Sequence, residues 1–119
     1  MKYLLLIYED EIRFTKQSKT ELEQMMGEYG QFTKSIIDGG QFQAGAQLQP
    51  VASATSVRVR DGKRLLTDGP FAETREQLGG YYLIDAKDLD EAIGIAERIP
   101  SARFGTIEVR PLVHAPSGA

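Results

Sequence analysis

The sequence KYLLLIY, residues 2–8, decides the predicted fold, because it is apolar on both faces of an extended chain. Successive side chains of a strand point to opposite faces of its sheet. A strand that is apolar on both faces is buried on both sides, so it belongs in the middle of a sheet. The sequence GYYLID, residues 80–85, has the same property. These two segments are therefore predicted to be central strands.

Two other segments alternate between apolar and polar residues, which is typical of strands with one solvated face. They are residues 41–48, QFQAGAQL, and residues 106–112, TIEVRPL. In the first, we expect the alternation to place Phe42 and Ala44 on the same face. We expect both segments at the edges of the sheet.

Two helices are predicted between these strands. The first begins at the capping box TELE, residues 20–23, and ends at the glycine pair 39–40, since glycine readily takes the left-handed conformation that ends helices. The second begins after Asp88 as its N-cap and ends at Pro100.

A hairpin completes the predicted order. Asp61-Gly62 is a tight-turn sequence, so we expect residues 56–60 to pair with residues 63–67. The order β-α-β-hairpin-β-α-β is the split βαβ, or ferredoxin-like, pattern of an α+β protein. In that topology the first and third main strands are central, which agrees with the apolar patterns.

One face of this sheet is left without helices, because two helices cover only the other. Monomers rarely expose an apolar patch of several hundred Å². We therefore expect a two-fold homodimer whose sheets face each other, with a cleft near the interface. Its polar rim is formed by Gln41, Gln43, Gln47, Glu108 and Arg110.

The composition argues against several classes of function. The chain has 119 residues and a net charge of -3, which disfavours nucleic-acid binding and anionic membrane surfaces. It has no cysteine and one histidine, His114, so we expect no metal and no other cofactor. No segment has the apolar core of a secretory signal or the ~20 apolar residues of a membrane span, so we expect a cytoplasmic protein. We expect one domain over residues 1–113 and a disordered tail over residues 114–119.

The sequence resembles a known family in four segments that together span nearly the whole chain. They are residues 1–8, 45–50 (GAQLQP), 67–93 and 107–112 (IEVRPL). These segments resemble the YCII-related family, in the branch named for its Asp-Gly-Pro-Phe (DGPF) signature, here residues 68–71. The resemblance implies a ferredoxin-like protomer in a dimeric α/β barrel.

The resemblance also bears on function. Members of this branch are similar to proteins encoded beside extracytoplasmic-function sigma factors, which implies a possible link to a sigma-factor pathway. In related members a His–Asp pair in the cleft has been proposed as catalytic, and one member is described as a dehydrochlorinase. The only histidine here is His114, in the predicted tail, so the His–Asp mechanism does not carry over.

Asp68 and Tyr29 are the candidate catalytic residues. Asp68 can act as an acid, a base or an anchor for a polar ligand. It can equally be a turn residue or an N-cap, with Pro70 at the first helical position, and we favour that structural reading. Phe71 is a candidate ligand contact, although the simpler reading is a hydrophobic anchor of the loop between the predicted strands at residues 63–67 and 80–85.

The candidate ligand-binding residues besides Phe71 are Tyr8, Tyr82, Arg58 and Arg110. About half of the strand tyrosines should face the cleft, where a phenol can form hydrogen bonds. The arginines can bind an anion bidentately, although we favour a solvated strand face or an inter-subunit salt bridge as their role. We expect a homodimer that binds an unknown small molecule or acts as a regulator. The alternative is a lyase or isomerase that uses Asp68 and a cleft tyrosine as acid and base.

Overall fold

The computed structural model describes residues 1–113, and the predicted tail with His114 lies outside them. The elements are β1 (Lys2–Glu9), α1 (Glu11–Thr15), α2 (Lys19–Asp38), β2 (Phe42–Gln47), β3 (Thr55–Arg60), β4 (Lys63–Asp68), β5 (Gln77–Asp85), α3 (Leu89–Glu97) and β6 (Thr106–Pro111). Short 3₁₀ turns lie at Val51–Ser53 and Pro100–Arg103. Within residues 1–113, no helix is both long and apolar enough to cross a lipid bilayer.

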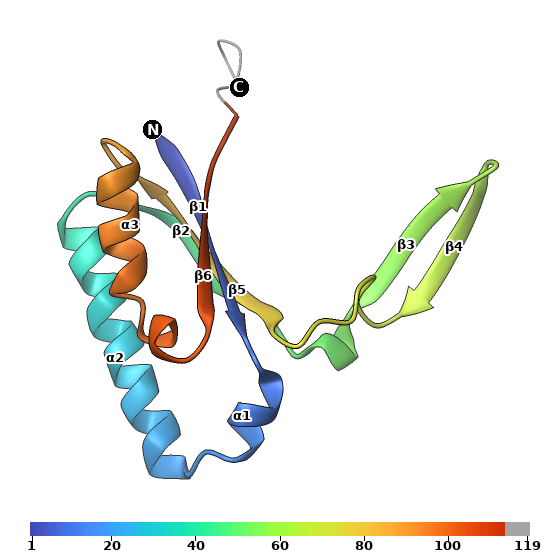
Figure 1. The fold of residues 1–119 in the computed structure, drawn as a ribbon, viewed down its shortest axis with the longest axis horizontal. Helices are drawn as coiled ribbons and strands as arrows, with labels where there is room; N and C mark the ends of the chain where they lie inside the picture. The colour runs from blue at the N-terminus through green and yellow to red at the C-terminus, as the bar shows by residue number, and fades with distance from the viewer. Residues whose placement is uncertain (114–119) are drawn as a thin grey trace.

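Four strands form one sheet in the order β2-β5-β1-β6, and every neighbouring pair is antiparallel. Helices α2 and α3 lie together on one side of this sheet (Figure 1). The prediction that residues 2–8 and 80–85 form the central strands is confirmed. The result is a mixed α+β fold that is consistent with the ferredoxin-like arrangement.

The hydrophobic core lies between this sheet and the two longer helices. Leu5, Ile36 and Ile84 have no exposed surface there, and they come from β1, α2 and β5. The side chains that alternate with this buried set point to the opposite side of the sheet. We call that side the open face. Its half-buried apolar residues on the central strands are Leu4, Leu6, Tyr8, Leu78, Tyr81 and Leu83.

Strand β2 does not follow the simple alternation that its sequence predicts. Its pairing with β5 shifts between Phe42 and Ala44, so that Phe42 lies opposite Ile84 on the helix-covered face. Ala44 then lies opposite Leu83, on the open face. The expectation that Phe42 and Ala44 share a face is wrong, because a bulge inserts one residue and reverses the pattern.

The helices begin at residues with side-chain caps. Helix α2 begins two residues earlier than predicted, because Ser18 Oγ accepts a hydrogen bond from the Glu21 amide at 3.1 Å. Ser18 and Glu21 have the same spacing as the predicted capping box at residues 20–23. The prediction for α3 is confirmed, since the Asp88 carboxylate accepts from the Glu91 amide at 2.9 Å.

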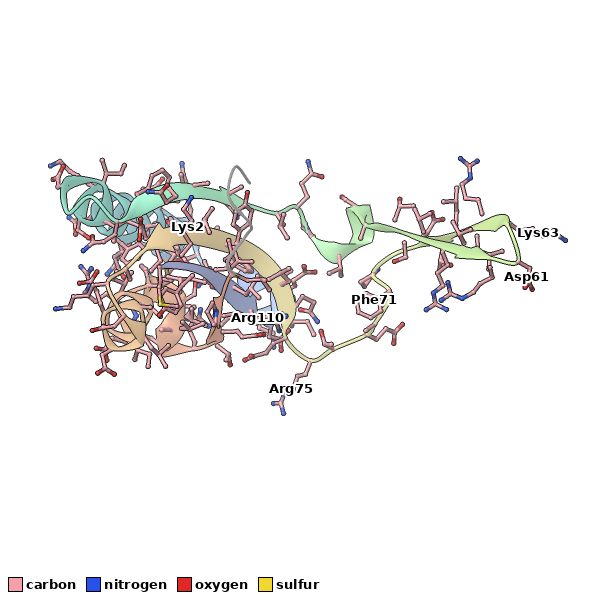
Figure 2. All side chains as sticks on the ribbon, turned by 90° about the horizontal axis from the view of Figure 1, so that it is seen from above. Lys2, Asp61, Lys63, Phe71, Arg75 and Arg110 are labelled. Atoms are coloured by element: carbon pink, nitrogen blue, oxygen red, sulfur yellow. The ribbon has the colours of Figure 1, made fainter. Side chains whose placement is uncertain are left out.

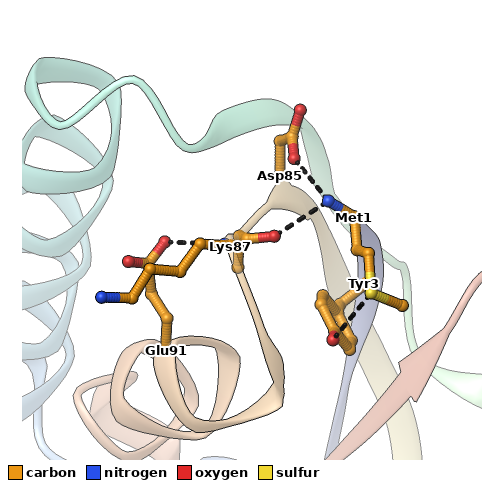
Figure 3. Close-up of polar contacts among 6 residues, drawn as sticks. Met1, Tyr3, Asp85, Lys87 and Glu91 are labelled. Carbon is orange, nitrogen blue, oxygen red and sulfur yellow. Dashed lines mark hydrogen bonds and ion pairs between the residues drawn. The ribbon is translucent and has the colours of Figure 1, made fainter.

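Polar contacts join the ends of β1 and β5 to the start of α3 (Figure 3). The Met1 amino group lies 3.2 Å from Asp85 Oδ1 and donates to the Ala86 carbonyl at 3.0 Å. The Lys87 amide donates to the Glu91 carboxylate at 3.3 Å. These contacts hold together the start of β1, the end of β5 and the start of α3.

Strands β3 and β4 form a separate two-stranded sheet, as the hairpin prediction requires. Asp61 and Gly62 have φ of 52° and 72°, as a type I′ turn requires. The hairpin extends far from the body, on the side of the sheet away from α2 and α3 (Figures 1 and 2). It accounts for a radius of gyration of 16.5 Å, where a compact chain of this length has about 13.5 Å.

Candidate functional site

A cavity of about 870 Å³ lies on the helix-covered side of the sheet, between α1, α2 and strands β1, β2 and β5. It therefore belongs to a single protomer, whereas the sequence led us to expect a cleft near a dimer interface. Most of its wall is apolar or aromatic. Those residues include Phe14, Leu22, Met25, Met26, Phe42, Tyr82 and Phe104.

Two glycines leave part of the cavity wall without side chains. A β-carbon at Gly45 would lie 2.8 Å from the Tyr82 ring, and one at Gly80 would lie 2.9 Å from the Ala46 carbonyl oxygen. Both distances are too short for a real side chain, so these positions require glycine. The backbone of β2 and β5 therefore lines the cavity directly at these points.

Tyr82 is fixed in the wall of the cavity by aromatic packing and one hydrogen bond. Its hydroxyl lies 2.6 Å from Thr33 Oγ1 on α2. Its ring packs edge-on against Phe32 and Phe42, with centroids 5.2 Å and 6.3 Å away. The phenol is therefore held in one orientation between the sheet and the helix.

Tyr29 also lines the cavity, and its hydroxyl is hydrogen-bonded to Ser101 Oγ, a buried group in the turn after α3. Burial raises the pKa of Tyr29 to about 12, although the hydrogen bond from Ser101 opposes this shift. A phenol with this pKa stays protonated at neutral pH. Tyr29 is therefore suited to hydrogen bonding rather than to acting as a base.

Glu9 is the buried acid of the site. It is 8% exposed and lines the cavity at the end of β1. Burial raises the pKa of its carboxyl group, the nearby Arg13 guanidinium opposes the shift, and Glu76 adds to it. A carboxyl group in such surroundings is ionised less readily than one in water.

Glu9 was not among the predicted site residues, since it begins a run of three carboxylates, residues 9–11, and such runs are usually solvated. The structure gives each of the three carboxylates a different place. Asp10 Oδ1 accepts from the Ile12 amide at 3.0 Å and caps α1, while Glu11 Oε2 accepts from the Val51 amide at 3.0 Å. Glu9 continues the buried odd-numbered positions of β1, and this alternation is the signal that could have identified it.

Helix α1, which the sequence reading did not predict, forms one wall of the cavity. The Glu11 amide donates to Gln77 Oε1 at 2.9 Å, which ties the helix to β5. The Arg13 guanidinium lies over the Phe104 ring, 3.4 Å from its centroid. This cation–π contact holds α1 against the segment that precedes β6.

The cavity brings together only Tyr29 and Tyr82 among the predicted site residues. Tyr8 lies on the open face, and Arg110 lies on β6, where its Nε donates to Glu108 Oε2 at 2.7 Å. Arg58 lies on the exposed hairpin. The roles of these residues in ligand binding stay predictions.

Asp68 and Phe71 do not take the structural roles that we expected. Asp68 is the exposed last residue of β4, and within residues 1–113 no helix begins there. Gly69 follows with φ of 95°, so the chain turns through a glycine instead of a capped helical turn. Phe71 is 80% exposed, so it does not anchor the loop on the described part of its protomer, residues 1–113.

The arrangement can hold an apolar molecule beside one buried carboxyl group and two fixed phenols. Among residues 1–113, there is no group of three or more His, Cys, Asp or Glu side chains that could hold a metal ion. Glu9, Tyr29 and Tyr82 are the polar groups of the wall that this ligand would meet, and Glu11, Arg13, Gln17, Gln47 and Gln77 also line the cavity.

Comparison with known proteins identifies the family. The YCII-related domain matches residues 1–115. A protein of Rhizobium meliloti (strain 1021), which is named as uncharacterised, is 40% identical over 114 residues, covering 94% of this chain and 92% of the relative. The match therefore extends over both the body and the hairpin, and the chain belongs to the YCII-related family.

Proposed function

We propose that the protein binds a small, largely apolar molecule in the cavity between α1, α2 and the sheet. The observation that carries this proposal is a cavity of about 870 Å³ with a mainly apolar wall and the buried carboxyl group of Glu9. Sites for small molecules are typically ~300–1,000 Å³ and combine apolar walls with a few polar groups.

The polar groups indicate which ligands fit. Glu11 is engaged with the Val51 amide, and Arg13 is stacked on Phe104. Glu9 is therefore the acidic group best placed to meet a ligand. We propose an apolar or aromatic ligand that carries one hydrogen-bond donor, such as an amine or a hydroxyl, directed at Glu9.

A thermal-shift screen tests the binding proposal with three versions of the protein. Met25→Trp fills the cavity, and Ile93→Trp is the control, because Ile93 is an exposed apolar residue on α3. A ligand at 100 times its Kd stabilises a protein by about 2.7 kcal/mol. We expect amine or phenol fragments that raise the Tm of the wild type and of Ile93→Trp, but not of Met25→Trp. Equal shifts in all three proteins, or no shift with any fragment, contradict the proposal.

A lyase or isomerase is the second candidate function, and the buried Glu9 carboxyl group favours it. An acid whose pKa is raised toward neutral pH is a better general acid or base than a solvated one. In this proposed enzyme, Glu9 takes a proton from the substrate or gives one to it, and Tyr29 orients the substrate. Asp68 lies on the hairpin, outside the cavity, so its catalytic role stays a prediction.

Turnover separates the two functions. Fragments that bind are incubated with the wild type, with Glu9→Gln and with the exposed control Glu23→Gln, and the products are analysed by mass spectrometry. An enzyme converts the fragment with the wild type and with Glu23→Gln, but not with Glu9→Gln. If all three proteins bind the fragment and none converts it, the result supports the binding function and contradicts the lyase or isomerase.

The proposal includes a homodimer in which two open faces meet, as in a dimeric α/β barrel. It is supported by the apolar central strands of that face, which α2 and α3 do not cover. Light scattering should give twice the chain mass of 13.2 kDa, and a monomer at micromolar concentration contradicts it. We also propose that the chain belongs to the DGPF branch of the family, because residues 68–71 are Asp-Gly-Pro-Phe. A cytoplasmic location and a link to a sigma-factor pathway complete the proposal.

A further inference from the structure

The β3–β4 hairpin has one apolar face and one basic face. Its cross-strand register pairs Val57 with Leu66 and Arg58 with Leu65, and paired residues point to the same side. One face therefore carries Val57, Val59 and Leu66, which are 60%, 62% and 56% exposed, together with Arg64, which pairs with Val59. The other face carries the basic residues Arg58, Arg60 and Lys63, together with Leu65.

Among residues 1–113, nothing covers the apolar face of the hairpin. Figure 2 shows the hairpin projecting from the body as a thin arm. A two-stranded hairpin without further packing is at best marginally stable in water, because its hydrogen bonds and side chains stay hydrated. The apolar face therefore needs an occupant, and the body formed by residues 1–113 does not supply one.

Two hydrogen bonds close the base of the hairpin. The Gly69 amide donates to the Ala54 carbonyl at 2.7 Å, and Ser56 Oγ donates to the Gly69 carbonyl at 2.8 Å. The arm extends on the side of the sheet that carries the open face (Figure 1). A molecule seated on the open face would thus lie on the same side as the arm.

The charges of the arm and of the body favour a second copy of the chain as this molecule. The two strands and the turn, residues 55–68, contain four basic and two acidic residues and carry a charge of +2. Because the whole chain carries -3, the rest of it carries -5. The arm of one copy and the body of another therefore attract each other, and attraction between unlike surfaces favours association.

We propose that the hairpin is an inter-subunit arm, whose apolar face of Val57, Val59 and Leu66 packs on the body of a second copy. A two-fold axis lets each copy offer its arm to the other, so that the assembly closes as a dimer. The inference extends the proposed homodimer by a second contact region, and its test is separate from the test of the open face.

Two adjacent leucines of β4 provide a matched pair of variants. Leu66→Gln removes an apolar side chain from the proposed contact face, while Leu65→Gln makes the same change on the basic face of the same strand. We expect Leu66→Gln to raise the dimer Kd about tenfold or more, and Leu65→Gln to change it by less than about twofold. Sedimentation velocity over a dilution series measures both. Equal effects of the two variants, or no effect of either, overturn the proposal.

A photo-crosslinking probe tests contact without relying on those variants. The full-length protein carries benzoyl-phenylalanine at position 57 in one sample and at position 93, on α3, in another. We expect the first sample to give a covalent dimer whose crosslink maps to the body of the second copy, and the second to give none. A stable dimer without a crosslink from position 57 overturns the arm but leaves the open-face dimer standing. A protein that sediments as a monomer overturns both.

Discussion

The body and the hairpin of this molecule are built from the same kinds of strand, but they differ in what stabilises them. In the body, β1 and β5 carry side chains such as Leu5 and Ile84 that lose all contact with water. Every residue of β4 in the hairpin is exposed. Hydrogen-bonded pairing is present in both regions, so pairing alone does not make a strand stable on its own. Burial distinguishes the two regions, since among residues 1–113 the hairpin side chains stay largely exposed.

The largest expected effect is the loss of a core side chain in the body. Ile36→Ala removes a fully buried side chain between α2 and the sheet, and such changes cost ~2–5 kcal/mol. Val59→Ala in the hairpin should cost less than ~0.5 kcal/mol at concentrations where the protein is monomeric, because this side chain is exposed. Urea unfolding followed by circular dichroism compares the two, and equal losses would remove the distinction between body and hairpin.

A smaller effect is expected at helix caps. Asp88→Ala should destabilise the protein by ~0.5–2 kcal/mol, because Asp88 caps α3 in the body. Asp68→Ala should change the free energy of unfolding by less than ~0.5 kcal/mol, since Asp68 ends an exposed strand and, within residues 1–113, no helix begins there. Thermal melts of both variants measure this. A comparable loss at Asp68 would show that the turn after β4 depends on that carboxylate.

The pH dependence of stability should report the burial of Glu9. Its folded-state pKa is raised above the ordinary value of 4.5, so between the two values the folded protein binds more protons than the unfolded chain. The free energy of unfolding therefore falls as the pH rises through this window. Above the window, the buried and ionised carboxylate of Glu9 destabilises the folded protein. Glu9→Gln removes this destabilisation.

We therefore expect Glu9→Gln to be more stable than the wild type at pH 8, with a difference that shrinks as the pH falls toward 4.5. Urea unfolding at pH 5 and pH 8 measures the difference. Glu23→Gln on the exposed face of α2 is the control, and it should give a difference that does not depend on pH in this way. A Glu9→Gln protein that is less stable than the wild type at pH 8 would mean that the carboxylate has a favourable partner.

The sequence was a good guide wherever a repeating pattern coincided with burial or with a turn. The two-sided apolar strands identified β1 and β5, and Asp61-Gly62 identified the hairpin. Helix α1 was missed because its five residues bury no side chain and so carry no clear periodicity. The bulge in β2 was missed because a register shift depends on pairing with β5 and has no signature in β2 alone.

The candidate site was harder to predict than the fold. Tyr29 and Tyr82 were identified as polar aromatics, but their meeting in one cavity depends on how far α2 stands from the sheet. That distance is set by tertiary packing, and no local pattern encodes it. Glu9 was missed for a different reason, since neighbouring carboxylates suggested solvent while the alternation of β1 pointed inward.

Hydrogen exchange of the wild-type protein across a dilution series tests most directly the claim that the body is self-sufficient and the hairpin is not. We predict that amides of β1 and β5 are protected at every concentration, because their strands lie in the middle of the sheet. Amides of β3 and β4 should be protected only at concentrations where the protein sediments as a dimer. Hairpin amides that stay protected in the monomer, or that exchange freely in the dimer, would contradict this account.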